Sequence, residues 1–215
     1  VLDRWLLSRL SSLRQQLVNY LDNYDVMRAS RLVAPFINDF STWYLRLSRE
    51  RLKAETSQQV SQVFATALAV SAQLFAPIVP FFSELVYQQL QDDDRSIHLS
   101  DYPEILADYQ DKELETAMNE LRQLVELGHA QRKSCQIPLR QPLAAVTFSK
   151  PASFKDNAEL MAILKQELNV KKVLWGKAQG KDIEVSFDLE ITADLAAEGQ
   201  ARQIIRRIQN WRKKA

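Results

Sequence analysis

The chain has 215 residues, of which 46% are hydrophobic and 26% charged, and its formal net charge at pH 7 is +1. This length suits one large or two small domains, and so average a composition argues against a disordered chain. Four glycines and a single cysteine exclude collagen-like sequence, an internal disulfide and a cysteine-based zinc site. No apolar run approaches the ~18 residues of a membrane-spanning helix, and no signal or transit peptide is visible at the start. We therefore expect no membrane partner and a reducing, cytoplasmic location.

Charge is segregated along the chain. Residues 57–127 carry a net charge of −9, residues 128–181 carry +7, and the basic residues of the last segment all follow Gly199. Such segregation is typical of a protein that meets a polyanion on selected faces only. It is also compatible with solvated helix faces, so charge alone leaves both interpretations open.

The first ~140 residues show the three- and four-residue apolar spacing of amphipathic helices. The predicted helices cover residues 2–21, 26–47, 60–75, 80–90 and 111–132. Pro35 lies inside the second helix and should kink or break it. Five long helices with short connections favour a helical bundle.

The pattern changes near Pro138. Strands are predicted over residues 143–148, 170–175 and 183–189, with a helix over 158–168 between the first two. A last helix follows Thr192, a suitable N-cap. Its apolar side, which we expect to be buried, consists of Ala201, Ile204, Ile205, Ile208 and Trp211. These patterns together predict a mainly α fold with a helical bundle over residues 1–138 and a small α/β subdomain over residues 139–215.

No catalytic signature stands out in the sequence. The four glycines are scattered and form no phosphate-binding loop, and there is no nucleophile elbow around a serine. His98 and His129 offer little for metal or acid–base chemistry, and Cys135 has no evident base beside it. We therefore expect no catalytic, cofactor-binding or metal-binding residues in this chain.

The most informative stretch for binding is residues 41–53. Arg46, Arg49 and Lys53 share one helical stripe, Trp43 lies one turn below Arg46, and Arg51 continues the neighbouring face. Such a row suits a nucleic-acid backbone, with an aromatic ring available to stack on unpaired bases. The same spacing aligns Trp43 with the apolar residues of its helix, so a place in the core is equally open.

Two further basic sets raise the nucleic-acid hypothesis above a generic solvated surface. One set lies near the domain junction and the other on the last helix. The residues predicted to contact nucleic acid in these sets are Arg132, Lys133, Arg140, Arg202 and Arg206.

Several segments resemble a known family. Residues 2–10, LDRWLLSRL, are similar to the opening of the anticodon-binding domain in class I aminoacyl-tRNA synthetases of the isoleucyl, valyl and leucyl group. Residues 43–51, WYLRLSRER, and 96–103, SIHLSDYP, resemble the isoleucyl form of that group. The match continues in order through residues 74–87, 137–143, 167–171 and 198–214.

The resemblance implies the tRNA-binding part of a ligase that joins isoleucine to tRNA(Ile). The parent enzyme would use ATP and magnesium, but the HIGH-type and KMSKS-type signatures of its ATP site are absent here, and no editing domain could fit. We therefore expect a catalytically inactive C-terminal fragment with a truncated second subdomain. Its partners would be tRNA(Ile) and the catalytic domain of the same polypeptide, with no self-association.

Two alternatives remain beside this reading. One is the same region of a valyl or leucyl enzyme, and the other is a helical protein-interaction scaffold. Glu50 and Pro138 depart from the family pattern, and both reduce the positive charge expected at a tRNA contact.

Overall fold

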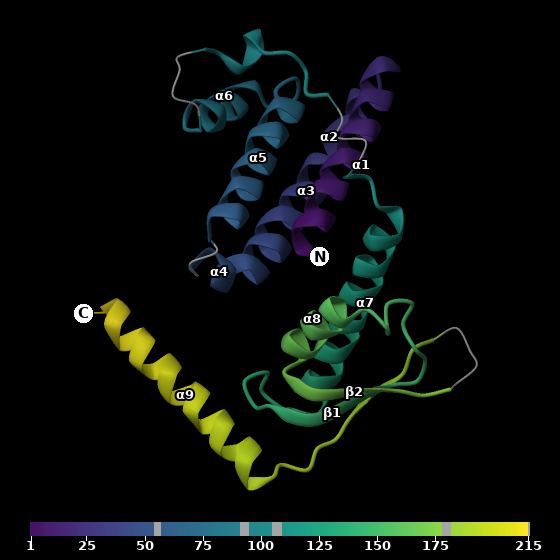
Figure 1. Cartoon of the computed structure of the whole chain (residues 1–215), viewed down its shortest axis with the longest axis vertical. Helices are drawn as coiled ribbons and strands as arrows, with labels where there is room; N and C mark the ends of the chain where they lie inside the picture. Colours follow the sequence, from purple (N-terminus) through teal and green to yellow (C-terminus); the bar gives the residue numbers. More distant parts are fainter. Residues whose placement is uncertain (54–56, 91–94, 105–108, 178–181, 215) are drawn as a thin grey trace. The chain divides into compact units, whose positions relative to one another are not determined.

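The computed structural model describes residues 1–53, 57–90, 95–104, 109–177 and 182–214. The chain divides into two compact units, residues 1–115 and residues 116–215 (Figure 1). The first unit is helical, and the second combines helices with a small sheet. The predicted mainly α fold, a bundle followed by an α/β subdomain, is confirmed.

Helices account for the regular structure of the first unit. Its elements are α1 (Leu2–Asp22), α2 (Val26–Arg31), α3 (Val33–Asn38), the π-helical η1 (Asp39–Tyr44), α4 (Leu45–Lys53), α5 (Ser57–Phe75), α6 (Pro80–Gln88), the 3₁₀ turn η2 (Ile97–Leu99) and the first residues of α7 (Lys112–Ser134). The predicted second helix is interrupted at Leu32 and resumes as α3. Pro35 lies in the first turn of α3, where its missing N–H breaks no hydrogen bond.

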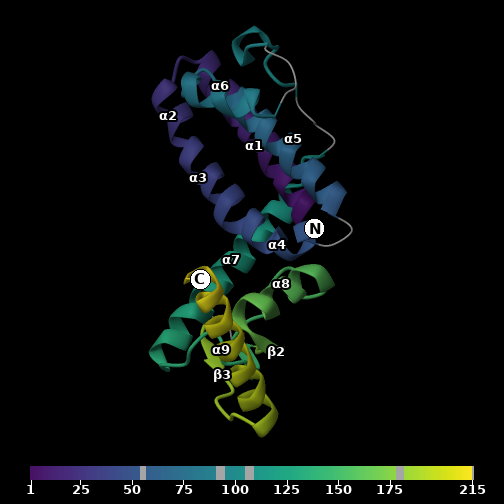
Figure 2. The same ribbon diagram turned by 90° about the vertical axis from the view of Figure 1, so that its left-hand side faces the viewer.

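The core of the first unit follows the apolar stripe of α1. Its buried members are Leu2, Trp5, Leu6, Leu10, Leu13 and Leu17. Helix α5 runs alongside α1 in both views (Figure 1 and Figure 2). A cluster of rings extends this core, with ring centroids 6.1 Å apart for Phe36 and Phe75 and 5.0 Å apart for Phe40 and Phe64.

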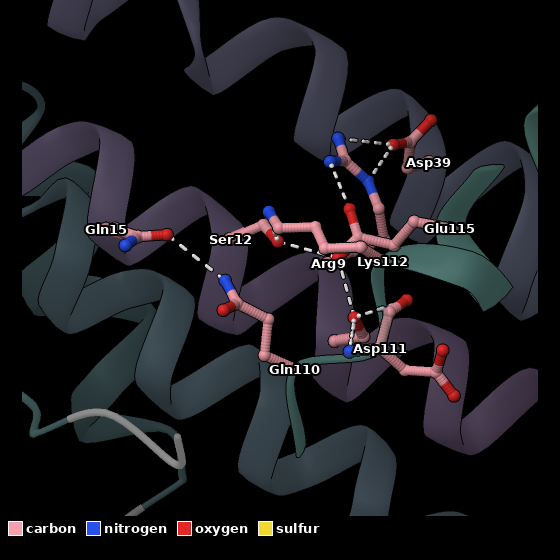
Figure 3. A network of polar contacts seen from close by, with 9 residues as sticks. Arg9, Ser12, Gln15, Asp39, Gln110, Asp111, Lys112 and Glu115 are labelled. Atoms are coloured by element: carbon pink, nitrogen blue, oxygen red, sulfur yellow. Dashed lines mark hydrogen bonds and ion pairs between the residues drawn. The ribbon is translucent and has the colours of Figure 1, made fainter. Parts of the chain in front are cut away.

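A buried polar network holds α1, η1 and the start of α7 together (Figure 3). The guanidinium of Arg9 donates to the carboxylate of Asp39 at 3.0 and 3.1 Å and to that of Glu115 at 3.3 Å. The hydroxyls of Ser8 and Ser12 each donate to Oε1 of Glu115 at 2.6 Å. Because a buried carboxylate is costly without partners, these contacts fix the three elements in one arrangement.

The second unit is built on a three-stranded sheet in the order β2-β1-β3. Strands β1 (Leu143–Phe148) and β2 (Val170–Trp175) are parallel and joined by α8 (Ala158–Leu168). Strand β3 (Val185–Phe187) pairs antiparallel with β1 and is shorter than the predicted strand over 183–189.

The C-terminal part of α7 belongs to the second unit. A ring nitrogen of His129 lies 3.1 Å from the carbonyl oxygen of Glu167 in α8, and Gly128 is packed so closely on Leu168 that a side chain there would clash. The boundary between the two units therefore lies after Glu115, within α7, whereas the sequence predicted a boundary at residue 138.

The last helix, α9 (Ala193–Lys214), begins at Thr192, whose carbonyl oxygen accepts the N–H of Ala196 at 2.9 Å. Leu195 and Gly199 near its start are buried. The prediction that its apolar side is buried is wrong, because every residue from 201 to 212 is exposed. Spacing identified the apolar side, but no local signal tells whether another element covers it. None of the described helices is both long enough and apolar enough to cross a membrane.

Candidate nucleic-acid interface

Helix α4 carries three of the predicted cationic groups at the surface. Arg46, Arg49 and Lys53 are all exposed. The ammonium of Lys53 lies 3.0 Å from the carboxylate of Glu50, one turn earlier, in an exposed ion pair that contributes little to stability. The side chain of Arg49 makes no hydrogen bond or ion pair with a described residue, so its guanidinium is available to a phosphate.

Of the two positions that the sequence left open for Trp43, the structure shows the one in the core. Its side chain is only 7% exposed, so the ring cannot serve as a platform for an unpaired base. The guanidinium of Arg46 lies 5.3 Å from the centre of this ring, and its Nε donates to the carbonyl oxygen of Thr42 at 3.0 Å. Trp43 thus supports Arg46 from below and orients it through a cation–π contact.

Arg51 forms an ion pair within the first unit. Its guanidinium donates to both carboxylate oxygens of Asp3, one of them at 3.0 Å, and the hydroxyl of Tyr44 donates to the same carboxylate at 2.9 Å. Burial alone would raise the pKa of Asp3, but the hydrogen bonds from Arg51 and Tyr44 outweigh it and lower this pKa. Burial and the Asp3 carboxylate raise the pKa of Tyr44 well above its usual value. Arg51 therefore joins α4 to the start of α1, and its contact with nucleic acid stays a prediction.

Arg132 is also an internal residue, only 2% exposed. Its guanidinium donates to the carbonyl oxygens of Pro138, Gln141 and Asn169 at 3.2, 3.0 and 3.1 Å. The group also lies 5.1 Å from the centre of the Phe187 ring, and burial lowers the pKa of Arg132 to about 10. Such an arginine cannot reach a phosphate without leaving these partners, so its role is to organise the loop after α7.

The remaining predicted contact residues of the second unit lie at its surface. Lys133 and Arg140, on either side of that loop, are exposed, as is Arg206 on α9. Arg202 is exposed but engaged, since it donates to Oδ1 of Asn169 at 2.6 Å and to Glu198 at 2.8 Å. A hydrogen bond from Lys171, with Arg202 nearby, lowers the pKa of Glu198.

Sequence reasoning missed Asn169, on which this arrangement depends. Asn169 ends α8 in the left-handed conformation, with φ of 49°, and its side-chain amide donates to the carbonyl oxygen of Leu139 at 2.9 Å. Its own carbonyl oxygen accepts from Arg132 and from the N–H of Leu143. An asparagine directly after a helical pattern is a known signal for such a cap and could have identified it.

The candidate set therefore separates into two kinds of residue. Exposed cations suited to phosphate contact are Arg46, Arg49 and Lys53 in the first unit and Lys133, Arg140, Arg202 and Arg206 in the second. Trp43 and Arg132 support neighbouring segments from the interior, and the half-buried Arg51 does so through its ion pair with Asp3. Within the described ranges, no group of three or more His, Cys, Asp or Glu residues is arranged to hold a metal ion.

Comparison with known proteins gives a consistent result. Isoleucine–tRNA ligase of Deinococcus radiodurans is 34% identical over 208 residues, which cover 94% of this chain and 19% of that protein. The ligases of Chlamydia trachomatis and Streptomyces coelicolor are 36% and 37% identical, over 80% and 79% of this chain and 17% of each relative. The chain thus spans about a fifth of the length of these curated relatives.

A family comparison covers most of the chain. Residues 3–147 match the family described as the anticodon-binding domain of tRNA ligase. The match includes α4 with its exposed cations, the whole of α7 and the loop that Arg132 organises. On this evidence, the chain belongs to the family of anticodon-binding domains of tRNA ligases.

Proposed function

We propose that this chain is the tRNA-binding portion of an isoleucine–tRNA ligase and that it holds the anticodon arm of tRNA(Ile). The observation that carries the proposal is the exposed row of Arg46, Arg49 and Lys53 on α4, inside the region matched to the anticodon-binding family. The similarity to isoleucine–tRNA ligases along most of the chain supports the choice of isoleucine over valine or leucine.

The mechanism is positioning. Exposed arginines and lysines contact phosphates and fix the register of the tRNA, which carries the acceptor end toward a catalytic centre elsewhere in the parent enzyme. Placement matters because an error of about 1 Å can lower a rate on the order of a hundredfold. Trp43 and Arg132 contribute indirectly, by orienting Arg46 and by fixing the loop that ends at Arg140.

The rest of the proposal concerns the parent protein. It would consume ATP with magnesium, act as a monomer in the cytoplasm and contact this chain through its catalytic domain. The bundle over residues 1–138 would be the tRNA-binding module proper. The isolated chain should show no isoleucine-dependent ATP–pyrophosphate exchange, and exchange clearly above a mock preparation would contradict this part.

A salt-titrated binding assay tests the central claim. We expect tRNA(Ile) to bind with an affinity that falls linearly with salt on logarithmic axes. Arg49→Gln should weaken binding at low salt and reduce the magnitude of that slope by roughly 0.7–0.9, the share of one phosphate contact. Its effect on stability should stay within about 0.5 kcal/mol, as for other surface substitutions.

The matched control is Arg31→Gln, the same change at another exposed arginine of the first unit, in α2. It should leave both affinity and slope unchanged. An Arg49→Gln variant that behaves like this control would remove Arg49 from the interface. Tighter binding of tRNA(Val) or tRNA(Leu) would reassign the specificity, and no tRNA binding at any salt concentration would favour a protein-interaction scaffold.

A further inference from the structure

The first unit contains an apolar cavity whose lining includes none of the exposed cations of α4. Its volume is about 260 Å³, and it lies among α3, η1, α5 and α6. The rings of Phe36, Phe40, Phe64 and Phe75 form much of its wall. Apolar cavities of about 150 Å³ accept benzene, so this one has room for a molecule larger than a single ring.

One polar group in this wall lacks a partner. Ser83 is 1% exposed, lines the cavity, and its Oγ has no hydrogen-bond partner in the described part of the chain. Two other serines of the wall differ, because Ser41 and Ser71 donate to helix carbonyl oxygens at 2.6 and 2.9 Å. A buried hydroxyl without a partner is costly, and a ligand that brings one hydrogen-bonding group would remove that cost.

The cavity also has an edge at the surface. Ile37 and Phe82 line it and yet remain exposed, which gives a ligand a route between α3 and α6. The wall includes η1, and π-helical turns of this kind are frequent at functional sites. No charged side chain occurs among the described residues that line the cavity, so a charged ligand would be poorly matched.

We propose that this cavity is a binding site for a neutral, planar, bicyclic aromatic molecule with a single N–H or O–H group, which hydrogen-bonds to Oγ of Ser83. The volume sets the size of the ligand, the phenylalanine rings set its planar aromatic character, and the unpaired hydroxyl sets its one polar group. The site is separate from the cations of α4 and does not depend on tRNA.

Calorimetric titration of the whole 215-residue chain with indole, in the absence of tRNA, tests the proposal. Indene is the matched ligand, because it has nearly the same shape but no N–H. We expect indole to bind about fivefold more tightly than indene, the share of one hydrogen bond. Ser83→Ala should weaken indole binding more than fivefold, to below the level of indene, because the buried N–H of indole then has no partner, and it should leave indene binding unchanged.

Two further variants keep the result interpretable. Ser30→Ala, at a serine of α2 that does not line the cavity, should bind both ligands like the unmodified chain. Ala72→Leu, which adds volume inside the cavity, should abolish binding of both. Ser83→Ala removes an unpaired hydroxyl and should fold normally, as judged by its circular dichroism spectrum.

Two results would overturn the proposal. The first is no binding of either ligand up to its solubility limit. The second is equal binding of indole and indene with no effect of Ser83→Ala. This result would mean that Ser83 forms no hydrogen bond with the N–H of the ligand. Neither result bears on tRNA binding, so the two proposals stand or fall separately.

Discussion

Helices α1 and α9 have nearly the same length, 21 and 22 residues, and both place apolar residues at three- and four-residue steps. Their surroundings differ greatly. Leu17 in α1 has no exposed surface, whereas Trp211 in α9 is 69% exposed. Amphipathic spacing therefore shows that a helix has an apolar side, and it leaves open whether the fold covers that side.

The two helices are also attached in different ways. Helix α1 is held along its length by apolar packing, with Arg9 and Asp3 adding ion pairs to Asp39, Glu115 and Arg51. Helix α9 is attached near its start, largely by polar contacts. The side-chain amide of Gln141 donates to the carbonyl oxygen of Leu195 at 2.9 Å, and further contacts join Glu198 to Lys171 and Arg202 to Asn169.

The largest effect should come from truncating the buried stripe. Leu17→Ala should lower the free energy of unfolding by about 2–5 kcal/mol, because it removes a fully buried side chain and leaves a cavity. Ile208→Ala, the corresponding change on α9, should stay within about 0.5 kcal/mol. Denaturant unfolding followed by circular dichroism measures both, and a loss above about 2 kcal/mol for Ile208→Ala would show that the apolar side of α9 is covered in solution.

A smaller effect should come from the polar attachment of α9. Asn169→Ala should cost roughly 2 kcal/mol, since alanine in a left-handed conformation costs about 1–2 kcal/mol and the bonds to Arg202 and Leu139 are lost. Asn169→Gly loses the same bonds without the backbone strain and should cost about 1 kcal/mol less. Thermal unfolding of the pair separates the two contributions, and equal losses would mean that backbone conformation does not matter here.

The smallest effect concerns pH and the start of α1. The pKa of Asp3 is lower in the folded chain than in the unfolded one, so its stabilising contribution is complete above about pH 4–5 and is lost as pH falls through the folded pKa. Asp3→Asn should cost about 1 kcal/mol at pH 7, because the pair is partly solvated.

The same variant should flatten the acid side of the stability profile. Unfolding free energies measured from pH 7 down to pH 3 test the sign, with Asp22→Asn as the control at an exposed aspartate of α1. If Asp3→Asn loses stability on acidification as steeply as the unmodified chain, the Asp3–Arg51 pair is not responsible.

Much of the fold could be predicted from the sequence. The elements β1, α8 and β2 have the predicted ranges, and the predicted limits of α1 and α5 lie close to the observed ones. This succeeds because apolar periodicity and helix caps are local properties of the backbone and its nearest neighbours. The predicted fold class followed from the same local signals.

The candidate site could be predicted only in part. The exposed cations of α4 were identifiable because their stripe lies opposite the apolar residues of the same helix. From the sequence alone, Trp43 could be either a buried core residue or a ring that stacks on a base. In the same way, Arg132 could be predicted as a phosphate contact, because nothing in the sequence shows that it is buried. Both residues are buried. Arg132 meets Asn169, 37 positions away in the chain, because α7 packs beside α8.

The sequence by itself thus determined where most of the helices and strands lie, which side of each helix is apolar and which family the chain resembles. The tertiary structure decided which of those sides are covered, where α7 passes from one unit to the other and which arginines remain accessible. The physical reason is that periodicity depends on neighbours three or four residues away, whereas burial depends on contacts between residues tens of positions apart, such as Arg9 with Glu115.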